Sequence, residues 1–173
     1  MESKDVIQLL RLQRHDLMND LQIVHGYLSM GKTEKVTKKV NEIIEAFNRE
    51  RKLMNSNCPE FTLFLIQAKW LYNNIQITYD IHTEKSELQA FDVSLTIIGN
   101  AILEAISTEE FAVVEVELLL KDNHTAVEVE FTLEETYFQE SLFRKKMSKE
   151  LNEVLIKVQE LGSKIIYTLT IPA

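Results

Sequence analysis

Hydrophobic residues recur along the first 54 positions at the spacing of helices that pack in a bundle. From Ser3 onward, one apolar stripe follows at intervals of 7, 4, 3 and 4 residues: Leu10, Leu17, Leu21, Val24 and Leu28. Gly31 favours a helix end at that point, and a second stripe follows it: Val36, Val40, Ile43, Phe47 and Met54. The pattern predicts a helical hairpin over residues 1–56.

A hairpin of two helices has too little surface to cover these stripes. Each helix has one neighbour, and Met18, Ile23 and Ile44 widen the hydrophobic face beyond a single seam. A second copy of the chain would cover the exposed part. We therefore expect a homodimer in which two hairpins form a four-helix bundle with twofold symmetry.

A polar segment that ends in a proline, residues 55–59, marks the predicted domain boundary. The second domain is expected over residues 60–173. Its pattern predicts helices at 61–72, 92–107 and 137–161, and strands at 75–81, 113–120, 126–133 and 164–171, with a turn at 121–124. Glutamates alternate with apolar residues in the two middle strands, as in strands with one face in water. The fold class is α+β, with a helical hairpin followed by an α/β sandwich that has helices on one face of a mixed sheet.

Charge and composition argue against several classes of protein. The net charge is -8, with 10 Lys and Arg against 8 Asp and Glu in residues 1–54, and 9 against 19 in residues 55–173. An acidic chain of this kind does not favour nucleic-acid binding. No apolar run reaches the ~18 to 20 residues of a membrane span, and the N-terminus lacks a signal-peptide core, so we expect a cytoplasmic protein. The single cysteine, Cys58, has no disulfide partner, and no residue cluster has metal-ligand spacing.

His15 is the candidate reactive residue. With the leucine stripe in the bundle core, His15 points to solvent on the flank. Its helical neighbours there are polar: Gln8, Arg11, Asn19 and Gln22. A neutral imidazole nitrogen is a good nucleophile near pH 7 and also a leaving group. Phosphoryl transfer needs positioning and charge compensation. Arg11 or Arg14 would neutralise phosphoryl oxygens, and Asn19 would donate a hydrogen bond.

The residues around His15 resemble the phosphoacceptor box of the sporulation phosphotransferase B family, which is related to the box of citrate-type sensor histidine kinases. The matching stretch, which Gly26 and Leu28 follow, is Arg14-His15-Asp16-Leu17-Met18-Asn19-Asp20-Leu21-Gln22. By residue match the resemblance is strong over positions 10–32, and in architecture it covers the chain. It implies that His15 is the phosphorylated residue, that Asp16 belongs to the site, and that the hairpins form the dimer.

The same resemblance makes the second domain similar to the ATP-binding domain of histidine kinases. Such a site needs an asparagine-rich helix, an Asp-x-Gly-x-Gly turn and a glycine-rich lid. Asn100 stands on a matching helix, but Glu104 replaces a second asparagine. Glycine occurs only at positions 26, 31, 99 and 162, so the close backbone approach to a triphosphate is missing. We expect a degenerate ATPase domain without a working ATP site.

Together these observations predict a histidine phosphotransferase of a sporulation-type phosphorelay. His15 would accept a phosphoryl group from the aspartyl phosphate of a single-domain response regulator and pass it to the aspartate of a transcription-factor regulator. No cofactor is expected in this chain, and Mg²⁺ would belong to the partner regulator. Two alternatives stay open: a sensor kinase fragment that phosphorylates itself from ATP, and a non-catalytic dimeric adaptor that binds regulators.

Overall fold

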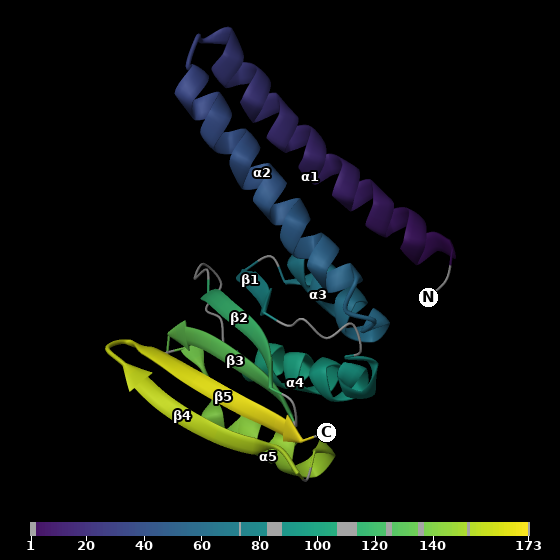
Figure 1. The fold of residues 1–173 in the computed structure, drawn as a ribbon, viewed down its shortest axis with the longest axis vertical. Coiled ribbons are helices and arrows are strands. Elements are labelled where there is room, and N and C mark those ends of the chain that lie inside the picture. The colour runs from purple at the N-terminus through teal and green to yellow at the C-terminus, as the bar shows by residue number, and fades with distance from the viewer. Residues whose placement is uncertain are drawn as a thin grey trace. The chain divides into compact units, whose positions relative to one another are not determined.

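The computed structural model describes residues 3–72, 74–82, 88–106, 114–123, 126–134, 137–151 and 153–172. The chain divides into two compact units, Met1–Arg51 and Lys52–Ala173. Two long helices, α1 (Ser3–Ser29) and α2 (Thr33–Met54), form the hairpin, whose last few residues belong to the second unit. The predicted helical hairpin is confirmed (Figure 1).

The turn between α1 and α2 follows directly from Gly31. Its φ of 68° lies in the left-handed region, where glycine carries no steric penalty. The amide of Lys32 donates to the Tyr27 carbonyl (2.9 Å), and the amide of Gly31 donates to the Leu28 carbonyl (3.0 Å). This paired arrangement is the Schellman motif, which satisfies the last carbonyls of a helix.

The second unit is a five-stranded mixed sheet with helices on one face (Figure 1). The strand order is β1-β2-β3-β5-β4, in which β1 and β2 are parallel and the other pairs are antiparallel. The strands are β1 (Ile75–His82), β2 (Val114–Asn123), β3 (Ala126–Glu134), β4 (Leu155–Leu161) and β5 (Lys164–Pro172). The helices are α3 (Pro59–Leu71), the short 3-10 helix η1 (Gln89–Phe91), α4 (Asp92–Ala105) and α5 (Glu140–Glu150). The predicted α+β class is confirmed.

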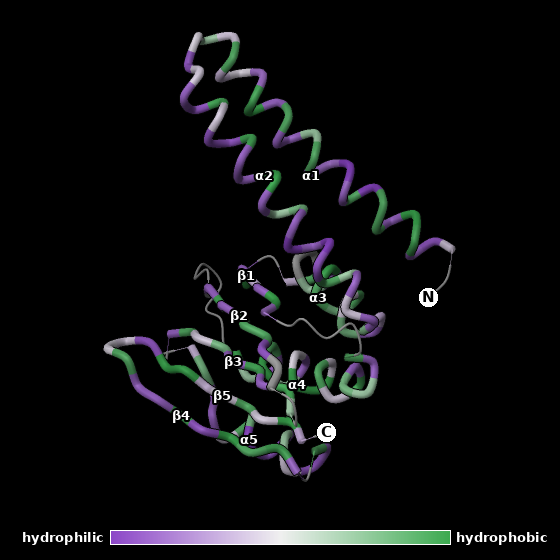
Figure 2. The backbone as a smooth tube through the Cα atoms, in the orientation of Figure 1, coloured by the Kyte–Doolittle hydropathy of each residue, from purple (hydrophilic) through white to green (hydrophobic). Residues whose placement is uncertain are grey.

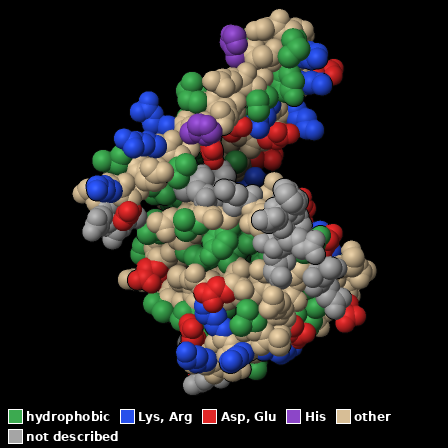
Figure 3. Space-filling view, turned by 180° about the vertical axis from the view of Figure 1, so that it is seen from behind, with side chains coloured by type: hydrophobic (Ala, Val, Ile, Leu, Met, Phe, Trp, Pro, Cys, Tyr) green, Lys and Arg blue, Asp and Glu red, His purple; other side chains and the backbone are tan. Residues whose placement is uncertain are grey.

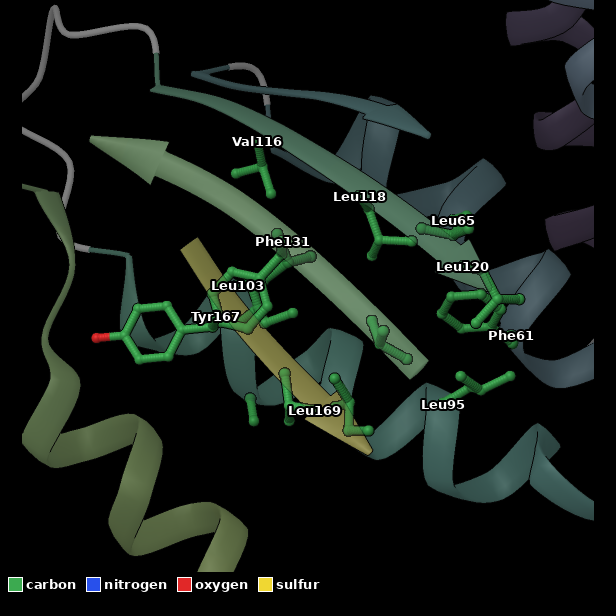
Figure 4. Close-up of a cluster of buried hydrophobic side chains, with 14 of the residues drawn as sticks. Phe61, Leu65, Leu95, Leu103, Val116, Leu118, Leu120, Phe131, Tyr167 and Leu169 are labelled. Carbon is green, nitrogen blue, oxygen red and sulfur yellow. The ribbon is translucent and has the colours of Figure 1, made fainter. Parts of the chain in front are cut away.

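The core lies between the sheet and its helices. Alternate residues of β3 and β5 are buried, as expected for strands with one covered face. Phe131 stacks on Tyr167 with ring centroids 4.8 Å apart, and Phe143 of α5 meets Phe131 edge-on at 5.5 Å. Figure 4 shows these strand residues together with helix side chains such as Phe61 and Leu95. Figure 2 shows hydrophobic and hydrophilic residues in turn along the helices and strands.

One predicted element is wrong. Residues 137–161 were expected to be helical, but α5 ends at Glu150 and residues 155–161 form the edge strand β4. Gly162, with φ of 66°, turns the chain so that β4 pairs antiparallel with β5. The spacing of Leu155, Val158 and Leu161 also fits a helix, and pairing with β5 decides the outcome. The predicted turn at 121–124 is also wrong in part, because residues 121–123 continue strand β2 and pair with β3. Residue 124 of that turn, residue 107 of the predicted helix and residue 113 of the predicted strand lie outside the described residues.

Asp92 caps the N-terminus of α3 from the start of α4. Its carboxylate accepts the amides of Glu60 (3.1 Å) and Phe61 (2.8 Å) and is buried. Pro59 has no amide hydrogen, so these are the donors of the first turn that need a partner. The buried acid thereby ties α3 to α4.

We expect Asp92→Asn to lower the free energy of unfolding by about 1 to 2 kcal/mol. The amide keeps one acceptor but turns a donor toward a backbone N–H, so one buried N–H loses its bond. Urea unfolding followed by circular dichroism measures the change. Glu153→Gln, at an exposed acid of the same unit, is the matched control and should stay within about 0.5 kcal/mol of the parent. An equal loss in both variants would contradict the capping role.

Candidate functional site

The His15 side chain lies in the middle of α1 and is 70% exposed. Its Nδ1 atom is 3.3 Å from Asn19 Nδ2 and 3.6 Å from Asp16 Oδ1. Among the described residues, Nε2 makes no hydrogen bond or ion pair. The ring is therefore held from its Nδ1 side, and the Nε2 nitrogen is presented to solvent.

His15 is exposed because it lies on neither the face of α1 that contacts α2 nor the leucine stripe. Most of the partly buried residues of α1 turn toward α2, among them Leu9, Gln13, Asp16, Asp20 and Tyr27. At 100° per residue these lie about 100 to 160° around the helix from His15. The predicted leucine stripe lies about 90° further on, and its members are still exposed: Leu10 (52%), Leu17 (38%), Leu21 (48%) and Leu28 (58%). His15 points away from both faces.

The two hairpin helices are joined by polar contacts as well as apolar ones. Gln13 Nε2 donates to Glu50 Oε1 (3.1 Å), and Lys39 Nζ lies 2.8 Å from Asp20 Oδ1. The hydrogen bond to Asp20 raises the pKa of Lys39, so this ammonium stays charged. These bridges set how α1 and α2 are aligned. The apolar pattern does not predict these bridges, because Gln13 and Asp20 lie outside the leucine stripe.

The remaining predicted site residues share the solvent side of α1. Gln8, Arg11, Arg14, Asn19 and Gln22 are all exposed. Asn19 contacts the His15 ring directly, whereas the described structure gives no contact between the ring and the other four. Two guanidinium groups and two amides thus surround an exposed imidazole at a distance. This face can meet an anion that a partner carries to it.

The other reactive side chains of the described chain are less suited to nucleophilic chemistry. Cys58 is buried, its Sγ donates to the Leu88 carbonyl (3.1 Å), and burial raises the pKa of the thiol to about 11, so it stays protonated. His82 turns its Nε2 to Asp80 Oδ2 (2.9 Å), and this bond lowers the pKa of the Asp80 carboxyl. Within the described residues no three His, Cys, Asp or Glu side chains could hold a metal ion.

Asn100, the residue of the expected ATP-site helix, is tied to its own helix. Its Nδ2 donates to the Thr96 carbonyl one turn back (2.9 Å). At the end of α4, Glu104 pairs with Lys146 of α5. The segment after β3 bonds to α4 as well, since the Gln139 amide donates to the Ala105 carbonyl (2.8 Å) and Phe138 bridges to Ile106. These contacts join α4 to α5 and to the segment before it.

None of the helices in the described chain is long and apolar enough to cross a membrane. The apolar residues of α1 and α2 lie on an otherwise charged surface, where Figure 3 shows them interspersed with Lys, Arg, Asp and Glu.

The hairpin matches a known family model. Residues 1–56 match the family model described as sensor kinase SpoOB-type, alpha-helical domain. Sporulation initiation phosphotransferase B of Bacillus subtilis (strain 168) is 30% identical over 93 residues, which are 54% of this chain and 48% of that protein. The aligned part therefore spans about half of the relative's length.

Two solved structures resemble the chain at low identity. The catalytic domain of histidine kinase ThkA is 15% identical with a TM-score of 0.41, covering 69% of this chain and 91% of that one. A bacterial phosphotransferase is 10% identical with a TM-score of 0.35, covering 98% and 97%. Neither value carries information on chemistry. The comparison that bears on His15 is therefore the match over residues 1–56, which are similar to the alpha-helical domain of SpoOB-type sensor kinases and carry His15 exposed on their first helix.

Proposed function

We propose that this chain is a homodimeric histidine phosphotransferase of a sporulation-type phosphorelay. His15 accepts a phosphoryl group from the aspartyl phosphate of a single-domain response regulator and passes it to the aspartate of a transcription-factor regulator. The observation that carries the proposal is the exposed His15 ring, held at Nδ1 by Asn19 and Asp16 and open at Nε2. The relative from Bacillus subtilis supports it by its printed name.

The geometry supports attack by Nε2. The Nε2 lone pair forms a bond to phosphorus while the bond from phosphorus to the aspartyl oxygen breaks, and the regulator's carboxylate leaves with that electron pair. If Nδ1 carries the proton, the ring becomes positively charged as the new bond forms. Asp16 Oδ1, 3.6 Å from Nδ1, stabilises that charge. Asn19 holds the ring, and its amide oxygen can accept the Nδ1 proton after rotation about the last side-chain torsion.

Dimer formation is part of the proposal because the hairpin cannot bury its own leucines. No residue of α1 is buried, and Leu53 is the buried residue of α2. A second copy would cover the leucine stripe and complete a four-helix bundle. His15 lies opposite to that interface, so both copies would keep their imidazole accessible.

The regulator is expected to bring the metal. An exposed imidazole on the same side of α1 as Arg11 and Arg14 suits a phosphoryl anion, and the described residues offer no metal cluster. We propose that Mg²⁺ lies in the regulator's acidic pocket and that this chain needs no cofactor. The structural neighbour ThkA was crystallised with the response regulator TrrA, and that complex is a property of ThkA.

Transfer is tested with both partners purified. A single-domain response regulator is labelled on its aspartate with radioactive acetyl phosphate and Mg²⁺ and is then mixed with this protein. Label should move to this chain within seconds to minutes and onward when a second regulator with a transcription-factor domain is added. The phosphorylated chain should lose its label in acid and keep it in alkali, as phosphohistidine does. A chain that binds the regulator but never carries label would instead be an adaptor.

ATP-dependent kinase activity is not expected. Glycine occurs only at positions 26, 31, 99 and 162, so the chain lacks a glycine-rich lid, and the Asn100 side chain donates to its own helix. Incubation of the protein with labelled ATP and Mg²⁺ should leave it unlabelled. Stoichiometric labelling of His15 by ATP would replace the phosphotransferase proposal with the sensor-kinase alternative.

The residues around His15 should affect transfer without affecting the dimer. Alanine at Arg11, Asn19 or Gln22 removes an exposed group that the partner would meet, so we expect an intact dimer and a loss of about 1 to 3 kcal/mol in regulator binding or transfer. Sedimentation and transfer rates measure both effects. Asn41→Ala, at an exposed asparagine of α2, is the matched control. Unchanged affinity and rate in all three variants would contradict the placement of the docking face.

A further inference from the structure

Gly26 lies inside α1, three residues before its end, where glycine is an unfavourable choice. Its carbonyl accepts the Met30 amide (3.1 Å), so its backbone is part of the helix. Glycine in a helix interior costs up to about 1 kcal/mol relative to alanine, because the free chain loses more conformational freedom. A glycine at this point therefore needs another reason.

The other three glycines have reasons within the fold. Gly31 and Gly162 have positive φ values of 68° and 66° in turns. At Gly99 of α4, a Cβ atom would clash with the Phe64 ring of α3, so a side chain there would displace that ring. Gly26 has neither property: its φ is not positive, and a Cβ atom there would meet nothing within 4 Å. The described chain leaves room for a side chain at this position.

The place of Gly26 on α1 points to the face of His15. Eleven residues along a helix amount to about 16 Å of rise and return to within about 20° of the same direction. From Gly26, the residues turned toward α2 lie about 80 to 140° around the helix, and the leucine stripe lies about 140 to 180° around it. Gly26 is partly buried in the single chain. A second copy that covers the leucines would add nothing over it, because Gly26 lies on the same side of α1 as His15.

A partner that reaches His15 would extend to Gly26. A stable protein interface covers about 800 Å² on each partner, which is a patch of about 16 Å radius. Met18, one turn beyond His15 on this side, keeps 53% of its surface in water, and exposed methionines are frequent on surfaces that bind other proteins. Continuity with His15 therefore identifies the occupant as the response regulator of the proposed reaction.

We propose that Gly26 is a docking residue for the response regulator, which packs against the bare backbone of α1 there while its aspartate meets His15. The inference rests on the proposed function. Gly26 determines how closely the regulator approaches, and it takes no part in the chemistry at Nε2. Added side chains at this position should weaken docking in proportion to their size.

The test compares Gly26→Ala and Gly26→Leu in transfer from the labelled single-domain regulator at increasing regulator concentration. We expect the half-saturating concentration to rise about threefold for Ala and tenfold or more for Leu. The maximal transfer rate should stay within about twofold, because His15 is untouched. Both variants should melt no lower than the parent, since alanine and leucine are better helix formers. Ser148→Leu, at an exposed small residue of α5, controls for added apolar surface and should change neither constant.

Two results would overturn the inference. One is an unchanged half-saturating concentration in Gly26→Leu. The other is a lower melting temperature in Gly26→Ala, which would show that the glycine serves the fold of the hairpin. If the parent protein itself takes no label, the proposed function fails and the inference fails with it. Labelling of the parent and of Gly26→Leu with the same concentration dependence would reject the docking role alone.

Discussion

His15→Gln is expected to abolish transfer of label from a phosphorylated regulator, with the rate falling below detection. Glutamine keeps a polar side chain of similar reach but has no nucleophilic ring nitrogen, so no phosphoryl bond can form. The side chain at this position is 70% exposed, and an exposed substitution changes stability by no more than about 0.5 kcal/mol. The protein should therefore keep its fold and oligomeric state while losing the reaction.

His25→Gln is the matched control for this prediction. His25 is an exposed histidine of the same helix, ten residues further along, which places it about 80° around α1 from His15. Transfer rates and sedimentation of both variants would be measured side by side. Loss of labelling in His15→Gln alone supports the assignment. Undiminished labelling of His15→Gln would show that another residue carries the phosphoryl group.

The hairpin was predictable because its determinants are local. Heptad spacing and Gly31 are read directly from the chain, and both appear in the structure as α1, α2 and the turn between them. The exposure of His15 follows from the same periodicity. What periodicity could not show is the partial burial of Gln13 and Asp20, because polar residues that bridge two helices look like ordinary surface residues in the sequence.

The second unit shows where local patterns fail. Strands β1, β2, β3 and β5 were expected from alternation and β-branched residues, but β4 was taken for the end of a helix. The exposure of β4 is the physical reason. None of its residues is buried, so its sequence carries little alternation, whereas β1 at the other edge of the sheet buries Ile75 and Ile81. Long-range pairing with β5, which no local pattern reports, determines its conformation.

The capping of α3 by Asp92 could not be predicted from the sequence either. The acid stands 31 residues from the Phe61 amide that it accepts, and helix caps are ordinarily expected from the residue just before the helix. The same holds for the pair of Glu104 with Lys146, which joins α4 to α5 and which no local pattern indicates.

Leu21→Asp should dissociate the dimer and remove transfer as a consequence. Leu21 belongs to the leucine stripe and is 48% exposed in the single chain, so a second copy would bury it. The substitution removes an apolar contact and places a carboxylate in the bundle core, where an unpaired charge costs several kcal/mol. Twofold symmetry applies this cost twice in each dimer. Each 1.4 kcal/mol weakens association tenfold, so the variant should be monomeric at micromolar concentration.

Gln22→Asp is the control that isolates the effect of position. It places the same charge one residue further along, on a side chain that is exposed and turned about 20° from His15. Because that side faces solvent, Gln22→Asp should sediment as a dimer with the mass of the parent. Sedimentation equilibrium over a range of concentrations distinguishes the two variants, and circular dichroism shows whether Leu21→Asp keeps its helices. A dimeric Leu21→Asp would mean that the leucine stripe does not form the interface and that the direction of His15 must be assigned anew.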